Sequence, residues 1–269
     1  MSQHPFDEAL AATAETDGSW AGKTSAQYAN MVGPYGGFLA AQAIAAVLRH
    51  PDLLGEPVAL TVNFCAAMAD GPFVAQARAA RTNRSTQHWI VELLQHGKPV
   101  ITATAITATR RETWGVAELP MPVVSAPQDT PRPPGQARVP WIHRYDFRFV
   151  HGGFPSVWDG SSGDDSRSLL WVRDEPPRPL DFASLTALSD VFYPRIWRRR
   201  ARMTPLGTVS MTVYFHADAA QLRETGTGFL RGQAQAQAFH NGYFDQTAQL
   251  WNESGRLLVT THQLVYFKE

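Results

Sequence analysis

The sequence predicts an α+β fold built from two similar halves, each with a long apolar helix followed by antiparallel strands. Three observations lead to this prediction. Residues 36–48 are rich in Ala and Leu and apolar on nearly every face, which is typical of a buried helix. Strand-like runs rich in Val, Ile and Thr follow that helix, separated by turn residues. The same order of elements recurs in the second half, after a proline-rich stretch.

The elements of the first half follow from its turn residues. Short extended pieces are expected around Trp20 to Met31, and His50-Pro51 ends the helix because a residue before proline is pushed out of helical geometry. Asp70-Gly71, Asn83-Arg84 and His96-Gly97 stand at hairpin-like distances. The predicted strands span residues 56–66, 72–83, 86–96 and 99–109.

The second half repeats this order. Asp181 is expected to cap a helix that runs through Leu188 to Val191 and is ended by Pro194. The predicted strands span residues 207–217, 227–240, 243–252 and 256–267. The halves also share residue identity. One parallel is between Thr61-Val62-Asn63-Phe64 and Thr212-Val213-Tyr214-Phe215, and a second is between residues 97–102 and residues 255–260. Continued along the chain, the second parallel places Ala105 at the position that Gln263 occupies in the second half.

A helix wrapped by antiparallel strands is the hotdog arrangement, so the repeat predicts a double hotdog whose sheet continues across the junction of the halves. The predicted domains are residues 1–112 and residues 141–269. Residues 113–140 between them are rich in proline, which rarely occupies helix or sheet interiors, and are expected to form an extended linker.

Composition excludes several classes of function. The chain has 24 Lys+Arg and 24 Asp+Glu, and a formal net charge of zero argues against nucleic-acid binding. No run approaches the roughly 18 apolar residues of a transmembrane helix, so no membrane partner is expected. The single cysteine, Cys65, fits a reducing compartment, and residues 1–5 show no signal peptide. We therefore expect a cytoplasmic protein.

The common motifs of covalent and metal-dependent catalysis are absent from the sequence. There is no Gly-x-Ser-x-Gly elbow and no phosphate-binding Gly-x-x-x-x-Gly-Lys run. The histidines lack metal-ligand spacing, and no cysteine pair exists. No metal or cofactor is predicted, which leaves noncovalent activation of water, or binding alone.

Three runs in the second half carry a specific resemblance. They are Leu188-Ser189-Asp190, residues 207–216 with Thr208 near their start, and residues 255–263 ending in Gln263. In this order they resemble the C-terminal half of the TesB-like (type II) acyl-CoA thioesterases, a double-hotdog family. Tyr35-Gly36-Gly37 resembles the Gly-Gly that opens the first helix of that family. The sequence departs from the family pattern at Ser210 and Met211, where an acidic residue and a histidine are usual, and at Leu264-Val265.

The resemblance implies an acyl-CoA thioesterase with one catalytic set per chain and a dimer of double hotdogs. Asp190 would accept the proton of the attacking water, while Thr208 and Gln263 would orient that water. Backbone N–H groups at a helix N-terminus would stabilise the oxyanion, and Gly36 and Gly37 would let the thioester approach such a backbone closely. The remaining candidates for substrate binding are Tyr35 in the acyl pocket and Arg198 and Arg199 on the phosphates of CoA.

Two other functions stay open at this point. The chain could be a noncatalytic acyl-CoA-binding or scaffold protein that keeps the hotdog fold. It could also be a hotdog hydratase or dehydratase, which requires a histidine with a carboxylate in the cleft, and the sequence shows no clear pair of this kind. The thioester donor could be CoA or a carrier protein.

Overall fold

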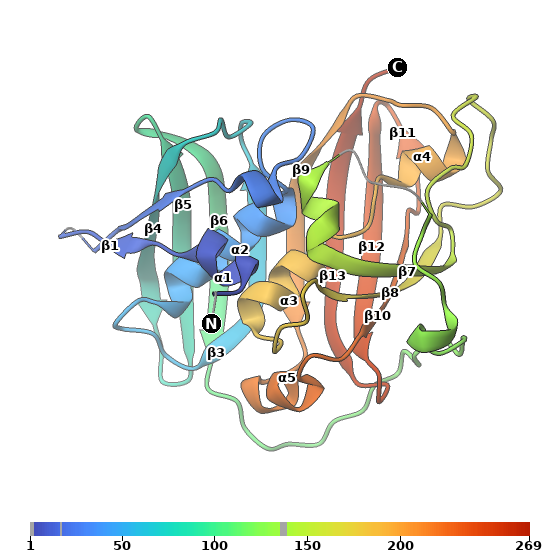
Figure 1. Cartoon of the computed structure of the whole chain (residues 1–269). Coiled ribbons are helices and arrows are strands. Elements are labelled where there is room, and N and C mark those ends of the chain that lie inside the picture. Colours follow the sequence, from blue (N-terminus) through green and yellow to red (C-terminus); the bar gives the residue numbers. More distant parts are fainter. Residues whose placement is uncertain (1–2, 17, 135–138) are drawn as a thin grey trace.

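The computed structural model describes residues 3–16, 18–134 and 139–269, and its strands form one continuous antiparallel sheet (Figure 1). The sheet has 13 strands in the order β1-β2-β4-β5-β6-β3-β9-β13-β12-β10-β8-β7, with β11 paired to β12. The first half supplies one side of this sheet and the second half the other. The predicted α+β double hotdog is confirmed.

The elements of the first half are α1 (Pro5–Leu10), β1 (Thr13–Ala14), β2 (Trp20–Lys23), η1 (Ala26–Tyr28), α2 (Gly36–Leu48), β3 (Glu56–Phe64), β4 (Pro72–Thr82), β5 (Thr86–Gln95) and β6 (Lys98–Ala108). Those of the second half are η2 (Pro127–Asp129), η3 (Pro140–Arg144), β7 (Tyr145–His151), β8 (Ser168–Asp174), α3 (Phe182–Leu188), α4 (Arg195–Arg199), β9 (Leu206–Phe215), α5 (Ala219–Thr225), β10 (Leu230–Gln235), β11 (Phe239–His240), β12 (Tyr243–Asn252) and β13 (Leu257–Phe267).

The two halves are related through the pairing of β3 with β9. Outward from this pair the first half runs β3-β6-β5-β4-β2-β1, and the second half runs β9-β13-β12-β10-β8-β7. Thr61 and Thr212, which the sequence echo had aligned, are direct partners across the junction, with their hydroxyl oxygens 3.0 Å apart. The internal repeat therefore corresponds to a twofold-like arrangement of the halves.

Helices α2 and α3 lie side by side over one face of the sheet (Figure 1). Eleven of the 13 residues of α2 are buried, as are all seven of α3, because both helices are apolar around their whole circumference. The main core joins residues of α2, α3 and both groups of strands in one cluster. The start of one helix can thus support the end of the other, which is the geometry on which the candidate site depends.

Three predictions about the second half need correction. Asp181 caps α3 as expected, with its Oδ1 accepting from the Ser184 N–H at 2.8 Å, but the helix ends at Leu188 and does not reach Val191. The second central helix is therefore short. The region predicted as one strand at 227–240 is divided into β10 and β11. Strands β7 and β8 were not predicted, because an irregular segment separates them and no tight turn marks the pair.

The proline-rich segment before residue 135 follows the second half in extended form. Within the described part of it, η2 is the only helical turn and no strand occurs. The Trp171 indole of β8 donates to the Ser125 carbonyl at 2.9 Å, and Arg148 of β7 donates to the Pro127 carbonyl at 2.8 Å. Residues 135–138 of the predicted linker lie outside the described residues, and the predicted domain limits stay a prediction.

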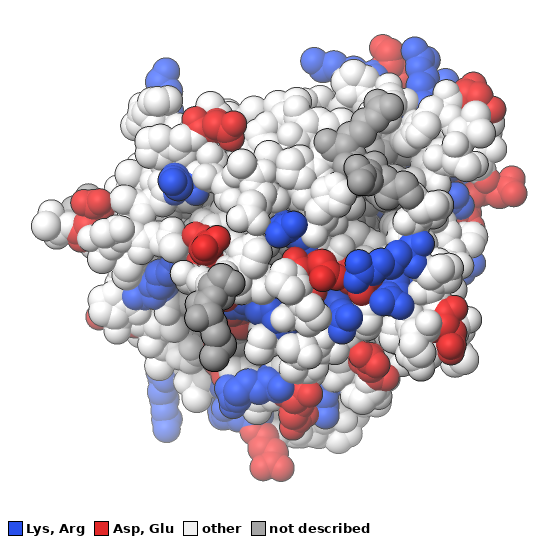
Figure 2. All heavy atoms as spheres, in the orientation of Figure 1, with Lys and Arg blue, Asp and Glu red and all other residues white. Residues whose placement is uncertain are grey.

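Charged residues of both signs are interspersed on the face shown in Figure 2. No large area of one sign is seen on that face, in keeping with the zero formal net charge. Within the described ranges, no helix is long and apolar enough to span a membrane. The same ranges contain no group of three or more His, Cys, Asp or Glu side chains that could hold a metal ion.

Candidate active site

Asp190 lies directly after α3, and the turn that ends this helix fixes its position. The Ser189 hydroxyl donates to the Leu185 carbonyl at 2.7 Å, and the Asp190 N–H donates to the Ala187 carbonyl at 3.1 Å. Because every residue of α3 is buried, the helix end cannot move independently of the core. The Asp190 carboxyl is therefore held in one place beside the sheet.

Gln263 reaches Asp190 from the central strand β13. Thr261, Gln263 and Val265 alternate onto the inner face of this strand, each 4% exposed. The Gln263 Nε2 donates to Asp190 Oδ1 at 2.8 Å and to the Met211 Sδ at 3.4 Å. Among the described residues no donor bonds the Gln263 Oε1, so this oxygen is left to accept a hydrogen bond from a ligand.

Thr208 shares the inner face with Gln263 because of a β-bulge. Alternation counted back from buried Met211 would place Thr208 on the outer face. Instead Val209 is left without a partner on β13, and Thr208 pairs with Val265. Cross-strand partners project from the same face, and Val265 is buried on the inner one. The half-buried Thr208 has no side-chain hydrogen bond to any other described residue, so its hydroxyl can bind water.

The start of α2 supports Asp190 from the first half. A Cβ at Gly36 would lie 2.8 Å from the Asp190 Oδ2, and a Cβ at Gly37 would lie 2.5 Å from the Ala187 carbonyl oxygen. Both distances are shorter than real contacts, so only glycine permits this approach. The Gly37 N–H also acts on the Asp190 carboxyl and lowers its pKa. These glycines thus bring a helix N-terminus, which favours negative charge, against the carboxylate.

Tyr35 joins the two halves beside the site. Its hydroxyl donates to the Ala187 carbonyl at 2.6 Å, and its ring stacks on Trp141 with the centroids 4.1 Å apart. Only 2% of Tyr35 is exposed. This side chain holds the end of α3 against the start of α2, and its contact with a substrate stays a prediction.

The environment of Asp190 suits a proton acceptor. Burial raises the pKa of its carboxyl from the ordinary value near 4 to about 7, while the hydrogen bond from Gln263 and the influence of the Gly37 N–H act in the opposite direction. The residue as a whole is only half-buried, so solvent or substrate can reach it. A base with this pKa is present in both protonation states near neutral pH.

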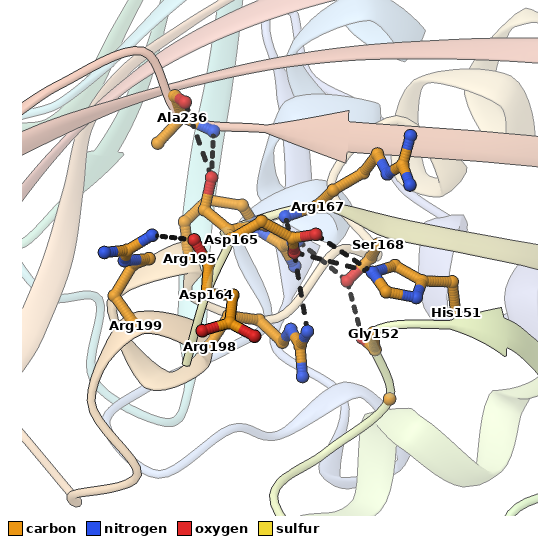
Figure 3. Close-up of polar contacts among 12 residues, drawn as sticks. His151, Gly152, Asp164, Asp165, Arg167, Ser168, Arg195, Arg198, Arg199 and Ala236 are labelled. Carbon is orange, nitrogen blue, oxygen red and sulfur yellow. Dashed lines mark hydrogen bonds and ion pairs between the residues drawn. The ribbon is translucent and has the colours of Figure 1, made fainter. Parts of the chain in front are cut away.

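Arg198 and Arg199 lie on the short helix α4, away from α2 and α3 (Figure 1), and beside Asp164 and Asp165 (Figure 3). The Arg198 Nη2 lies 3.5 Å from the Asp165 Oδ1, and Asp165 also meets the His151 Nε2 at 3.3 Å. Arg199 donates to the Asp164 carbonyl. Neither arginine forms a hydrogen bond or ion pair with Asp190, Thr208 or Gln263.

Two surface hollows meet at Arg199. One of about 440 Å³ is lined by residues 164–167, Arg199 and residues 235–240. The other, of about 620 Å³, is lined by Ser162, Ile196, Arg199, Arg200, residues 239–242, Phe267 and Glu269. None of Asp190, Thr208 and Gln263 lines either hollow. Ile196 and Trp197 of α4 belong to the same small buried cluster as Val265, the strand partner of Thr208.

Two histidine–carboxylate pairs escaped the sequence analysis. His151 meets Asp165, and His262 Nε2 lies 3.3 Å from the Asp245 Oδ2. Their members are 14 and 17 residues apart in sequence, so only the strand arrangement brings them together. His262 alternates with Gln263 and is exposed on the opposite face of β13. Neither pair bonds the Asp190 and Gln263 side chains.

Among its described residues, the first half has no pair that matches Gln263 and Met211. Gln263 pairs with Met211 of β9, and at the corresponding place Ala105 pairs with Leu60 of β3. This register agrees with the sequence echo, which placed Ala105 at the Gln263 position. The methyl side chain of Ala105 offers no polar atom, so the first half lacks a counterpart of the Gln263 amide at this position.

Comparisons with known proteins agree with this architecture. The acyl-CoA thioesterase N-terminal domain family matches residues 25–108, and the acyl-CoA thioesterase C-terminal domain family matches residues 122–267. A search of curated proteins gave no significant match.

Solved structures show the same fold over the whole chain. A conserved hot dog fold protein of unknown function from Alicyclobacillus acidocaldarius is 45% identical, with a TM-score of 0.93 over 100% of this chain and 99% of its own. The acyl-CoA thioesterase II of Mycobacterium marinum is 17% identical, with a TM-score of 0.76 and 98% of both chains covered. The TesB protein of Mycobacterium avium subspecies paratuberculosis is 17% identical, with a TM-score of 0.81 and 100% of both chains covered.

Proposed function

Because the chain belongs to the TesB-like acyl-CoA thioesterases, we propose that it hydrolyses an acyl-CoA thioester to a free acid and CoA, using a water held by Asp190, Thr208 and Gln263. The observation that carries this proposal is the hydrogen bond of 2.8 Å between the Gln263 Nε2 and the Asp190 Oδ1. It joins a carboxyl with a raised pKa to an amide whose oxygen is left to accept from water.

Each member of this set has one role in the reaction. The water donates one hydrogen bond to Asp190 and the other to the Gln263 Oε1, which directs an oxygen lone pair at the thioester carbon. The Thr208 hydroxyl, on the same face of the sheet, forms a further hydrogen bond with this water. Asp190 takes the proton as the C–O bond forms, and the C–S bond then breaks. The proton returns to the CoA thiolate, which leaves as the thiol.

The experiment that tests this function is a thiol-release assay over a series of acyl-CoA chain lengths. We expect turnover by the wild type and a loss of at least about 1000-fold in kcat for Asp190→Asn, since the amide cannot accept the proton. The acid limb of the wild-type kcat/KM profile should have its midpoint near pH 7, because the base must be ionised. Binding of acyl-CoA without thiol release would refute hydrolysis and favour the scaffold function.

We further propose that the hollows around Arg199 hold the phosphates of CoA. Arg199 lines both hollows, and Arg200 lines the larger one. Phe267 lines the larger hollow and stands four residues beyond Gln263 on β13, a distance of about 13 Å at ~3.3 Å per residue. The pantetheine arm is about as long as four or five extended residues, or roughly 15 Å. One CoA molecule could therefore place its thioester at Gln263 and its phosphates at Arg199. Asp165 holds Arg198 nearby.

Charge reversal at this position separates nucleotide binding from chemistry. Arg199→Glu should raise KM for acyl-CoA about tenfold or more, because a phosphate loses its guanidinium partner and meets a carboxylate. The same variant should hydrolyse the matching acyl-N-acetylcysteamine, which lacks the nucleotide, as the wild type does. An unchanged KM for acyl-CoA would place the phosphates elsewhere.

We also propose a dimer of double hotdogs in the cytoplasm. The outer face of the second half exposes several large apolar side chains that a partner sheet could cover, namely Tyr214, Tyr243, Leu264 and Tyr266. Light scattering should give twice the chain mass of 29.7 kDa. A monomeric mass at micromolar concentration would refute the dimer.

A further inference from the structure

Met211 makes a contact in the candidate site that its residue type does not suggest. Its side chain is fully buried, and it is the direct cross-strand partner of Gln263. The thioether Sδ accepts a hydrogen bond from the Gln263 Nε2 at 3.4 Å. The same nitrogen donates to the Asp190 Oδ1 at 2.8 Å. Both N–H bonds of the amide are thus used within the protein.

The orientation of the Gln263 amide decides what the site can do. With Nε2 toward Asp190 and Met211, the Oε1 is left to accept from water. With the amide rotated by 180°, the Oε1 would face the carboxyl and the sulfur, and the N–H groups would face the water. Water would then be held as an acceptor, with its lone pairs turned from the thioester carbon.

Asp190 alone cannot fix this orientation through a catalytic cycle. The ionised carboxylate only accepts hydrogen bonds, and so it selects the Nε2. Once the carboxyl has taken the proton it can donate to an amide oxygen, and the rotated amide becomes acceptable. The charged state and the protonated state therefore favour different orientations.

A thioether sulfur has no hydrogen to donate, whatever the state of Asp190. The sulfur therefore favours the orientation that turns the Gln263 Nε2 toward it, both when Asp190 is charged and when it is protonated. We propose that Met211 is a positioning residue, whose sulfur keeps the Gln263 amide in its orientation while Asp190 is protonated, so that the Oε1 is ready to accept from the next nucleophilic water. This proposal rests on the proposed function for its kinetic consequences, and on the described contacts for the orientation itself.

The groups around Asp190 keep their charge near neutral pH, so the orientation of the Gln263 amide is what changes when Asp190 is protonated. Tyr35, before α2, and Tyr145, on β7, are the titratable side chains that interact with the carboxyl, and burial holds the pKa of both hydroxyls well above 10, so they are neutral. The Gly37 N–H, at the start of α2, favours the charged form of the carboxyl. None of these groups changes its charge between pH 5 and 9.

Removal of the sulfur has two expected effects. In Met211→Leu the rotated amide accepts from protonated Asp190, which stabilises the acid form and raises the pKa of the carboxyl. The acid limb of kcat should therefore move to higher pH by about half a unit or more. At pH 7 kcat should fall roughly two- to tenfold, the effect of one neutral hydrogen bond, with KM unchanged.

Two controls separate positioning from packing. Met68→Leu removes the sulfur of another buried methionine, 2% exposed, which lies between β3 and β4 of the first half, and should leave the kinetics unchanged. Norleucine, which replaces sulfur by CH₂ without changing the shape of the chain, can be incorporated for all six methionines. Norleucine should reproduce the kinetic change in the wild type and add nothing in the Met211→Leu background.

The deciding measurement does not require turnover. The Asp190 carboxyl carbon can be titrated by ¹³C NMR in the wild type, Met211→Leu and the norleucine-labelled protein. The proposal expects a higher pKa in both altered proteins than in the wild type, even if the protein hydrolyses no acyl-CoA. An unchanged pKa in the norleucine-labelled protein would overturn it, as would a raised KM with unchanged kcat in an active enzyme. An absence of thiol release with the expected pKa change would refute the thioesterase function alone.

Discussion

At the scale of single residues, the second half holds two buried carboxyls with raised pKa values, and only one belongs to the candidate site. Asp174 ends β8 and is 3% exposed. Its Oδ2 accepts from the Ser184 hydroxyl of α3 at 2.5 Å, while its Oδ1 has no partner among the described residues. Burial raises the pKa of this carboxyl to about 7. Asp174 therefore anchors α3, and thereby Asp190, as a carboxylic acid.

This pKa predicts how stability depends on pH. A carboxyl that binds its proton more tightly in the folded chain stabilises the fold fully below its unfolded pKa, near 4, and this contribution is lost as pH rises through 7. In Asp174→Asn the amide oxygen can still accept from Ser184 and no charge develops. Urea unfolding at pH 5 and at pH 8 gives the stability that each protein loses between these two pH values. This loss should be smaller in Asp174→Asn than in the wild type by roughly 1–4 kcal/mol. Equal losses in the two proteins would contradict the buried acid.

The sequence predicted some residues of the candidate site and missed the roles of others. Asp190 and Gln263 were predicted from a resemblance, and they are in contact although 73 residues separate them. The roles of Gly36 and Gly37 in admitting Asp190, and of Met211 in bonding Gln263, were not predicted. They depend on the approach of two helices and on the register of two strands, and neither quantity has a local signal in the chain.

At the scale of elements, the bulge in β9 determines which residue of this strand enters the site. Strand alternation would place Val209, and not Thr208, beside Gln263. The bulge reverses this assignment, and only the register with β13 reveals it. Strands with tight turns were predicted to within two residues, except the divided region at 227–240, whereas β7 and β8, joined by an irregular segment, were missed for the lack of a turn signal.

An exchange of two residues tests the bulge. Thr208→Val should lower kcat about 10- to 100-fold, because the water loses a hydrogen-bond partner. Val209→Thr should have little effect. If the bulge fixes the faces, the double variant Thr208→Val/Val209→Thr should be as impaired as Thr208→Val alone. Recovery of kcat in the double variant would show that residue 209 faces the site. Equal melting temperatures would confirm that the comparison concerns the site and not the fold.

At the scale of the whole molecule, the candidate site belongs to both halves although its polar set comes from one. The pairing of β3 with β9 makes a single sheet, and the close packing of α2 on α3 sets the Gly36-Gly37 turn against Asp190. The first half thus acts as the support of a site in the second. The repeat predicted the sheet that continues across the junction, while the approach of α2 to Asp190 and the unequal lengths of the central helices appear only in three dimensions.

One measurement tests most directly whether Asp190 activates water without a covalent intermediate. A single turnover with enzyme in excess over acyl-CoA is carried out in H₂¹⁸O, and both the acid and the Asp190 peptide are analysed by mass spectrometry. Direct attack by water predicts one ¹⁸O in the released acid, none in the peptide, and no acylated chain at any time. An acyl adduct on the protein, or ¹⁸O in the Asp190 carboxyl, would contradict the mechanism.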